Sequence, residues 1–546
     1  MQNNNDSMVE QLVSEFNSAS TTRSTFESHW EEVSRLVLPA YSGTFTNGGS
    51  QLTPGSKRTQ SLHDSTAVIA LPRFAAVMES MLTPRNSKWH RLVSANPGLK
   101  KDRSTRLWMD ALTDAVFKYR YASTANFDSQ NGQTYLSSGA FGTGSTFIDE
   151  NMKTPGLRYR SVHLGETYFF EDHQGMIDKA ARRFLLSARQ AARWFGESRL
   201  PDRVKDKIGT NTQDVPNFKF LHWVTPREDR DMERADHKGM EYASYYIALD
   251  DKVMVKEGGY STFPYAVSRH LVISGETYGR SPAMEALPAI KTINDEKKTM
   301  LRMGHRTLDP VLLLPNDGIL DGFSLKAGAL NVGGVTRDGK RLVHELPVGD
   351  LVAGEKLMDL ERQHIHDAFF ITIFQILVDS PEMTATEVIE RVREKGVLLS
   401  PIMGRHQTEY LAPMIDREID VLSRQGLIPP MPPALREAGG EYKVEYDSPL
   451  SRAQRAEEAS GFLRMTETAL KVATEMQNPE PLDHFDWDVA IPELADIHAV
   501  PERWRRSLDA IQKIRAGRSQ QRQTEQAIQA APAVAAVLKN APSAIQ

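Results

Sequence analysis

The sequence predicts an α+β protein that is mainly helical, and three observations support this fold class. Before about residue 141, and again from about residue 282 onward, apolar side chains recur three or four positions apart, as in amphipathic helices. Between about 146 and 273 the pattern changes to short runs rich in β-branched and aromatic residues. The chain has 546 residues, of which 40% are hydrophobic and 25% charged, a composition typical of a globular protein with room for several domains.

The N-terminal part is predicted to be helical because each segment gathers its apolar residues on one stripe. In the first helix the stripe runs from Val9 to Val37, and in the second it ends at Leu82, with Pro72 expected to kink or restart the helix. A stretch rich in Gly, Thr, Ser and Asn separates the two and is predicted to be a loop. The expected elements are helices at 8–38, 62–82, 102–120 and 126–141 and a loop at 42–57.

The middle of the chain is predicted to consist mostly of strands, interrupted by one helix at about 187–208. Gly142-Thr143-Gly144 lacks the third glycine of a dinucleotide-binding fingerprint, so we interpret it as a helix-to-strand turn. The strand-type runs are STFIDE, LRYRSVHL, TYFFED, KFLHWVTP, YASYYIALD and YAVSRHLVIS. This region is therefore expected to be mixed α+β.

A helix at 282–308 is predicted by its end signals. Ser281 is a good N-cap, Pro282 suits the first helical position, and Pro288 is expected to kink the helix two turns in. The helix should end near Asp309-Pro310, where proline disfavours continuation. The apolar stripe consists of Ala286, Leu287, Ile290, Ile293, Met300, Leu301 and Leu308, and the opposite face of Lys291, Asp295, Lys298, Arg302 and Arg306.

The remaining elements follow from the same signals. Thr384 and Glu387 have the spacing of a capping box, and Pro401 and Pro413 should break or kink the long helix that follows. The expected elements are a hairpin-like segment at 310–345, helices at 353–376, 385–425, 450–477 and 501–530, a strand at 441–446 and a connector at 484–500. The Gln/Ala-rich tail is either an extra helix or disordered.

Composition excludes several classes of protein. The net charge of −5 is less basic than expected of a protein that wraps nucleic acid. The absence of cysteine rules out disulfides, thiolate metal sites and cysteine nucleophiles. The N-terminus has neither the basic start nor the apolar core of a signal peptide. The apolar run at 369–378 is shorter than the ~20 residues of a membrane-spanning helix, so we expect no membrane insertion.

Motifs for catalysis are defective or absent. Gly334 to Lys340 has the outline of a phosphate-binding loop, but Arg341 stands where a Ser or Thr would hold magnesium, and an alternating pattern follows. Asp338-Gly339 instead predicts a hairpin turn. The carboxylates that a metal-dependent nuclease would need show no telling spacing: Asp64, Asp149, Glu150, Glu171 and Asp172. We therefore expect no enzyme, no cofactor and no metal.

Several blocks of the sequence resemble the head-to-tail connector, or portal, proteins of short-tailed bacteriophages. They occur in the family's order and spacing along most of the chain, and the tail shows the weakest similarity. The blocks are RSTFESHWEEVSRLVLP at 23–39, LHDST at 62–66 followed by LPRFAAVMESMLTPRNSKWHRL, YGRSP at 278–282 with 286–294, MTATEV at 383–388, and YLAPMIDREIDVLSRQGLIPPMP.

The resemblance implies a closed ring of about twelve copies around a DNA channel. Its parts would be an outer wing, a helical stem, a clip facing the packaging motor and tail, and a crown inside the capsid. The implied domains are a wing at 1–280, a stem helix at 281–308, a clip at 309–352, a second stem helix at 353–376, a tunnel loop at 377–386, a wing return helix and strand at 387–449, a crown at 450–515 and a C-terminal barrel or flexible tail at 516–546.

The resemblance also implies the function and the partners. The ring would sit at one capsid vertex of the virion, carry double-stranded DNA during packaging and ejection, and dock the terminase motor and then the tail. Its partners would be copies of itself, the DNA, the terminase large subunit, tail adaptor proteins, and the major capsid and scaffolding proteins. Assembly would take place in the host cytoplasm.

Candidate site residues combine the resemblance with the charge pattern. DNA-channel candidates are Lys291, Lys297, Lys298, Arg302 and Arg306, of which Lys297 lies beside the apolar stripe; tunnel-loop candidates are Asp379, Ser380, Pro381, Glu382 and Met383; motor-docking candidates in the clip are Arg337, Asp338, Lys340 and Arg341. Simple solvation, or pairing with Asp295 and Glu296, explains the channel candidates equally well. Two other functions stay open: a metal-dependent nuclease or packaging ATPase, and a tail or capsid adaptor without a channel.

Overall fold

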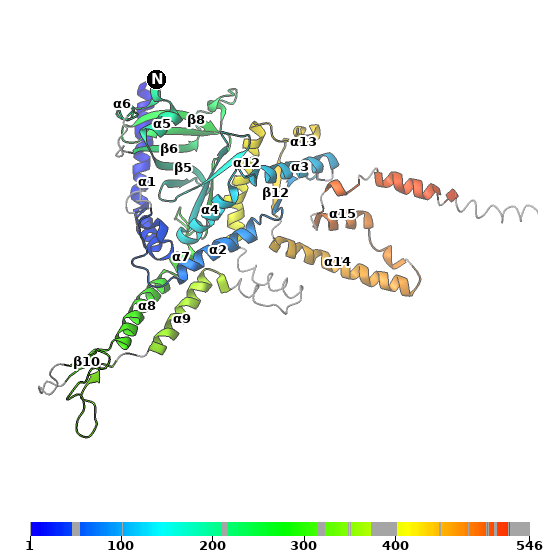
Figure 1. The fold of residues 1–546 in the computed structure, drawn as a ribbon. Helices are drawn as coiled ribbons and strands as arrows, with labels where there is room; N and C mark the ends of the chain where they lie inside the picture. Colours follow the sequence, from blue (N-terminus) through cyan, green and yellow to red (C-terminus); the bar gives the residue numbers. More distant parts are fainter. Residues whose placement is uncertain are drawn as a thin grey trace, which may run out of the picture. The chain divides into compact units, whose positions relative to one another are not determined.

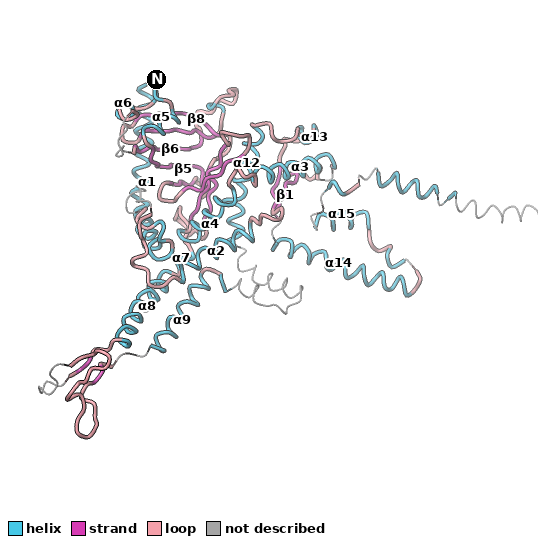
Figure 2. Tube along the Cα trace, in the orientation of Figure 1, coloured by secondary structure: helices cyan, strands magenta, loops and turns pink. Residues whose placement is uncertain are grey.

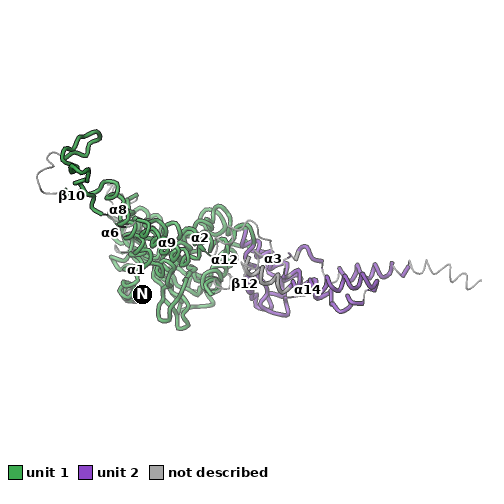
Figure 3. The backbone as a smooth tube through the Cα atoms, turned by 90° about the horizontal axis from the view of Figure 1, so that it is seen from below, with its two compact units in different colours: residues 1–87, 118–427 green, residues 88–117, 428–546 purple. Residues whose placement is uncertain are grey.

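A computed structural model of the chain shows two compact units, each built from separate stretches of sequence. Unit 1 comprises residues 1–87 and 118–427, and unit 2 comprises residues 88–117 and 428–546 (Figure 3). The structure describes residues 2–45, 55–100, 102–209, 217–314, 323–347, 349, 351–372, 401–446, 449–478, 480–497, 500, 502–506, 510–521 and 523–524.

Unit 1 contains a five-stranded antiparallel sheet and one long helix that packs on it. The helix is α1 (Gln2–Val37), and the strands, in sheet order, are β4 (Thr167–Glu171), β5 (Ile177–Leu186), β6 (Phe218–Pro226), β7 (Tyr242–Ala248) and β8 (Val253–Tyr260). Val9, Val13 and Phe16 of α1 pack on the sheet against Leu221 and Trp223, so that α1 covers one of its faces (Figure 1). The predicted helix at 8–38 is confirmed.

Two short helices replace the single helix predicted at 187–208. α5 (Ala188–Phe195) begins with a capping box between Ser187 and Gln190, and α6 (Asp202–Lys205) follows a 3₁₀ turn. Gly196 has a φ of +87° and Pro201 lacks an N–H, so the helix stops and restarts there. Phe195 and Val204 from these helices pack with Phe220 of the sheet in a second apolar core.

A three-stranded antiparallel sheet, backed by helices, connects to the rest of unit 1. Its order is β3 (Leu157–Val162), β2 (Thr143–Glu150) and β9 (Tyr265–Arg269), and α2 (Thr66–Leu82) and α4 (Phe127–Phe141) accompany it. Gly142, with a φ of +76°, ends α4 and starts β2, which confirms the predicted helix-to-strand turn. A Cβ on Gly142 would lie 2.0 Å from the carbonyl oxygen of Gly279, so only glycine fits there.

A helical hairpin extends from unit 1. α7 (Pro282–Glu285) and α8 (Leu287–Leu308) are separated at Ala286, and α8 lies beside α9 (Leu351–Ala368) (Figure 1). The interruption at Ala286, two residues before Pro288, confirms the predicted kink. α8 ends at Asp309, as predicted. α9 ends at Ala368, within the predicted 353–376, because Phe370 takes a φ of +58°; residues 373–376 lie outside the described residues.

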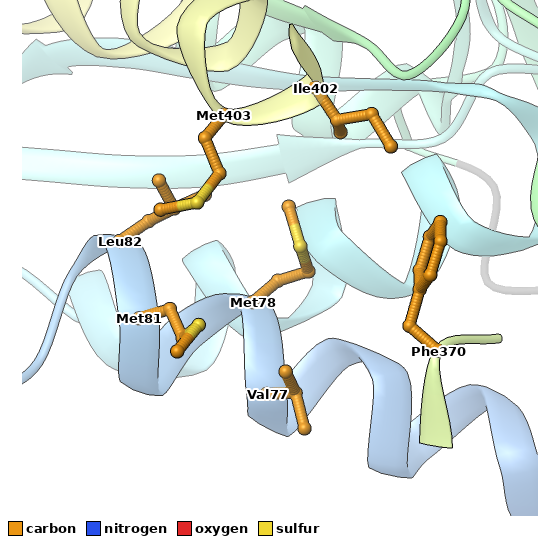
Figure 4. Close-up of a pocket in the computed structure, with 7 residues that line it drawn as sticks. All are labelled: Val77, Met78, Met81, Leu82, Phe370, Ile402 and Met403. Atoms are coloured by element: carbon orange, nitrogen blue, oxygen red, sulfur yellow. The ribbon is translucent and has the colours of Figure 1, made fainter. Parts of the chain in front are cut away.

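A helix at 401–424 returns to the core of unit 1. It contains a π-helical turn, Gln407–Leu411, directly before α12 (Ala412–Arg424), where the sequence predicted a break or kink at Pro413. The wider turn accommodates a proline that lacks an N–H and crowds the preceding carbonyls. Met403 at the start of this helix meets Phe370, Met78 and Leu82 around a small apolar cavity of 10 Å³, which has room for about one water molecule (Figure 4).

Unit 2 contains a two-stranded sheet and several helices. β1 (His90–Ser94) pairs antiparallel with β12 (Tyr442–Tyr446), and Trp108 of α3 (Arg103–Arg120) donates its indole N–H to the carbonyl of Pro429 at 3.0 Å. α13 (Pro433–Glu437), α14 (Pro449–Glu475) and α15 (Trp487–Ile497) follow. The connector predicted at 484–500 is therefore largely wrong, because Asp486 accepts hydrogen bonds from the N–H groups of Asp488 and Val489 and so caps α15.

The fold class is a mixture of helices and sheets, as predicted. Strands β1, β5 and β8 lie outside the strand-type runs recognised in the sequence (Figure 2). Within the described part of the chain, no helix combines the length and apolarity that crossing a membrane requires.

Candidate functional site

The hairpin of α8 and α9 carries the cationic residues singled out in the sequence. Lys298, Arg302 and Arg306 follow each other at intervals of four residues, are exposed, and so form one row along α8. Met300 lies about 200° around α8 from Lys298 and faces the neighbouring helix, α9. None of the three has an ion pair among the described residues. We call Lys298, Arg302 and Arg306 the cationic row.

The other two candidates occupy different settings. Lys291 forms an ion pair with Glu32 of α1, so its charge is already partnered. Lys297 is half-buried and, like Glu355, lines the groove between α8 and α9. The structure therefore brings together three of the five predicted channel residues and separates Lys297 from them.

Polar contacts fix the base of the hairpin. Ser281 is buried, accepts a hydrogen bond from the N–H of Met284 at 3.0 Å and donates one to the carbonyl of Ala140 at 2.8 Å. Asn294 accepts a hydrogen bond from the N–H of His63 at 2.7 Å and donates one to the carbonyl of Ser61 at 3.1 Å. The sequence offered no signal for Asn294, because a lone asparagine inside a helix usually faces solvent.

Close packing sets the spacing of α8 and α9. A Cβ on Gly354 would lie 2.6 Å from the sulfur of Met300, so glycine lets the helices approach each other.

On α8, Glu296 has a buried carboxylate oxygen without a hydrogen-bond partner among the described residues. Burial, together with the nearby charge of Glu361 on α9, raises the pKa of Glu296.

Apolar side chains remain uncovered on two sides of the hairpin. Leu301, Leu308 and Val352 line an open groove of 400 Å³ between the helices, and Leu308 is 86% exposed. On α9, Leu357 and Leu360 are 55% and 54% exposed. Because successive residues lie about 100° apart around a helix, these two leucines are on the side of α9 that faces away from that groove. Apolar surface of this kind, exposed on a single chain, indicates a contact with another protein surface.

A strand pair and a tight turn lie beyond the far end of the hairpin. β10 (Leu312–Leu313) pairs antiparallel with β11 (His344–Glu345). The candidates Arg337, Asp338, Lys340 and Arg341 surround a turn in which Gly339 has a φ of +75° and donates its N–H to the carbonyl of Thr336 at 3.0 Å. This confirms the predicted turn at Asp338-Gly339. The tunnel-loop candidates Asp379, Ser380, Pro381, Glu382 and Met383 lie outside the described residues.

The carboxylates weighed for an enzyme are each held by structural contacts. Asp149 lies 3.8 Å from Arg417, and Glu150 lies 3.6 Å from Arg424. Glu171 pairs with Arg269, Asp64 with Arg362, and Asp172 accepts hydrogen bonds from backbone N–H groups of its own turn. Among the described residues no group of three His, Cys, Asp or Glu side chains could hold a metal ion. In the described part of the chain, these carboxylates therefore show no arrangement typical of a metal-dependent nuclease.

The hairpin thus combines exposed apolar side chains with a row of cations that have no ion pair among the described residues. The family model for the bacteriophage head to tail connecting protein matches residues 9–505, and the chain belongs to this family. It is 29% identical over 530 residues to a probable portal protein of Bordetella phage BPP-1, covering 94% of this chain and 92% of that protein. It is also 26% identical over 532 residues to the portal protein of Salmonella phage epsilon15, covering 95% and 92%.

Family membership over nearly the whole chain confirms the resemblance found in the sequence. The chain has a head-to-tail connector, or portal, role in a bacteriophage and is a component of the virion. The family is structural, and the comparisons assign it no catalytic residue.

Proposed function

We propose that copies of this chain form a closed ring of about twelve subunits with a central channel for double-stranded DNA. The observation that carries the proposal is the hairpin, in which the cationic row and uncovered apolar residues lie on different sides of the same pair of helices. A ring subunit needs these features together. The apolar sides can pack against neighbouring copies, while the cationic row can face the bore.

The contact between neighbours would be heterologous. In a cyclic ring, one surface of each copy meets a different surface of the next. We propose that Leu357 and Leu360 of one copy enter the groove lined by Leu301, Leu308 and Val352 of its neighbour. Burial of a leucine side chain contributes about 1.5–3 kcal/mol, so two leucines per contact add appreciably to ring stability.

The cationic row suits the guidance of DNA better than tight binding. Each phosphate that a protein neutralises adds salt-dependent affinity, and many such contacts would hold the duplex in place. Three cations per copy, repeated around a ring, offer weak contacts that a moving duplex can exchange. Lys291 is engaged with Glu32, so we propose Lys298, Arg302 and Arg306 as the main DNA contacts.

The remaining parts are assigned by the same proposal. The wing is residues 1–280 with 387–449, the stem comprises α8 and α9, and the crown is 450–515, followed by a barrel or tail at 516–546. The clip, 309–352, would present Arg337, Asp338, Lys340 and Arg341 to the terminase large subunit and then to tail adaptor proteins. The tunnel loop would be 377–386. The ring would assemble in the host cytoplasm with the major capsid and scaffolding proteins.

Electron-microscope class averages of the purified chain test the proposal. We expect closed rings of about twelve subunits with a bore wide enough for a duplex. A compact, closed small oligomer without a bore would contradict it, and an adaptor function would then be the better interpretation.

A further inference from the structure

Opposite charges are separated into two consecutive blocks near the end of the described chain. Residues 475–502, the acidic block, contain no Lys or Arg; their acidic residues are Glu475, Glu480, Asp483, Asp486, Asp488, Glu493, Asp496 and Glu502. Residues 503–518, the basic block, contain one acidic residue, Asp509; their basic residues are Arg503, Arg505, Arg506, Lys513, Arg515 and Arg518. Segregation on this scale exceeds the mixed charge of an ordinary solvated surface.

Among the described residues, an ion pair between Arg515 and Asp488 joins the two blocks within the chain. The guanidinium of Arg515 donates two hydrogen bonds to the carboxylate of Asp488, the first at 2.7 Å and the second at 2.5 Å. Both side chains are more than half exposed. The pair shows that the two blocks carry groups suited to two-point contacts between a guanidinium and a carboxylate.

Several other described charges in the two blocks have no ion pair among the described residues. In the described part of the chain, no ion pair engages Glu475, Asp483 or Glu493 of the acidic block. The same holds for Arg503, Arg506 and Arg518 of the basic block, and all six side chains are exposed. The three acidic side chains named here and the three basic ones thus give each block exposed charge of one sign.

Large apolar side chains are exposed among these charges. Trp504 is 72% exposed at the start of the basic block, and Ile491 and Val489 are 59% and 51% exposed on α15. α15 itself is held to α14 through an aromatic cluster in which the rings of Phe462 on α14 and Trp487 on α15 lie 6.2 Å apart. Fixed apolar side chains with charges of one sign around them are typical of a protein-protein interface.

We propose that the acidic block of one copy docks on the basic block of the next copy in the ring. The inference rests on the proposed ring, and it adds a second contact that does not involve the hairpin. Cyclic symmetry brings an acidic surface against a basic one at every subunit boundary, so the ring closes without like charges meeting. DNA is a less suitable partner for the basic block, because the adjacent acidic block repels phosphates.

Two charge-reversed variants of the full chain test this contact. The acid-reversed variant carries Glu475→Lys, Asp483→Lys and Glu493→Lys, and the base-reversed variant carries Arg503→Glu, Arg506→Glu and Arg518→Glu. Both leave Asp488 and Arg515 in place. A matched control carries Glu197→Lys, Asp206→Lys and Glu228→Lys, which are exposed and unpaired among the described residues of unit 1. Equal thermal unfolding of all variants checks that they fold.

Mass photometry then gives the protein concentration at which half of the chains are in rings. We expect each reversed variant alone to require at least about tenfold more protein than the wild type, and the control to match the wild type. An equal mixture of the two reversed variants should recover wild-type assembly. In an alternating ring every boundary of the mixture again joins opposite charges.

The outcomes separate the possible explanations. Variants that assemble like the wild type would overturn the inference, while the ring itself stands. Variants that stay defective after mixing would overturn it in favour of pairing within one chain. A base-reversed variant that assembles normally but loses affinity for duplex DNA would overturn it in favour of a DNA contact. A wild-type chain that forms no ring would overturn both this inference and the proposed function.

Discussion

Arg120 and Glu418 form a two-point ion pair from which water is excluded. The Nε of Arg120 donates to Glu418 at 3.0 Å, its Nη2 donates at 2.5 Å, and neither side chain is exposed. The hydroxyl of Tyr159 donates to the same carboxylate at 2.5 Å. The pair joins the end of α3 to α12 in the interior of unit 1.

Removal of one partner should destabilise unit 1 strongly. Glu418→Gln leaves the guanidinium of Arg120 buried without a counter-charge, which costs about 3–5 kcal/mol. We expect a lower unfolding temperature and faster amide exchange in α12. The double variant Arg120→Leu/Glu418→Leu removes both charges and should be less destabilised than Glu418→Gln. A double variant as unstable as the single one would show that packing around the pair matters more than its charges.

Acid should weaken unit 1 through its buried histidines. Burial lowers the pKa of His222 to about 3, and the nearby charges of Arg182 and Lys256 act in the same direction. Both ring nitrogens of His222 are in hydrogen bonds, to Tyr265 at 2.9 Å and Ser244 at 3.0 Å. Because the unfolded chain takes up a proton near pH 6.5 and the folded one does not, the stability is present above pH 6.5 and is lost as pH falls.

The expected loss is about 2 kcal/mol for this histidine at pH 5. Unfolding temperatures measured from pH 7 to pH 4 should therefore fall less steeply in His222→Gln than in the wild type. His173→Gln, at an exposed position, is the control and should keep the wild-type slope. Identical slopes in all three proteins would assign the acid sensitivity to other groups.

Asn294 should hold the segment before α2 against the hairpin. Asn294→Ala leaves the N–H groups of His63 and Asp64 without their acceptor, at a cost of about 1–3 kcal/mol. Hydrogen exchange should then accelerate at residues 61–64 and in the first turns of α8. Thr292→Ala, on the exposed side of α8, is the comparison. Unchanged exchange at 61–64 would show that other contacts hold the segment.

The cationic row should matter for DNA transport and not for assembly. The variant Lys298→Glu/Arg302→Glu/Arg306→Glu replaces attraction of phosphates by repulsion, so DNA-filled heads should fall by roughly tenfold while rings still form. The measurement is DNA content in phage particles made with the variant. Lys356→Glu, an exposed reversal on α9, is the control. Wild-type filling with the triple variant would remove the row from the DNA path.

The leucines of α9 should drive contact between neighbouring hairpins. Leu357→Ala/Leu360→Ala removes apolar surface, so the concentration needed for half-assembly should rise by roughly tenfold to a hundredfold. Leu330→Ala, at a side chain that is 94% exposed, should leave assembly unchanged. If the double variant assembles as the wild type does, these leucines lie outside the ring contact.

The elements that the sequence predicted well are those whose local signals agree with their burial. Ser281 and Pro282 start the hairpin helices and Asp309 ends α8, because capping depends on residues close in sequence. β5 was missed because its Asp178, Lys179 and Arg182 interrupt the apolar alternation that identifies a strand. Pairing with its sheet neighbours determines its conformation, and one of them, β6, is distant in sequence.

Part of the candidate site could be predicted from the sequence, and part could not. The cationic row was predictable, because a spacing of four residues places side chains on one face of a helix. The pairing of Lys291 with Glu32 was not, because it depends on how α1 packs against α8. The exposed pair Leu357 and Leu360 was also missed, because the exposure of a leucine depends on which elements pack beside its helix in the folded chain.

The division of unit 2 between two stretches of chain affects the order of events during synthesis. Arg91 and Glu445 meet across the β1–β12 pair although they are 354 positions apart. At ~5–20 residues per second, the ribosome needs roughly 20–70 s to make the chain between them. Throughout that interval β1 has no strand to pair with. Unit 2 is therefore completed late in translation, and a chain truncated before residue 442 would leave β1 as an unprotected sheet edge.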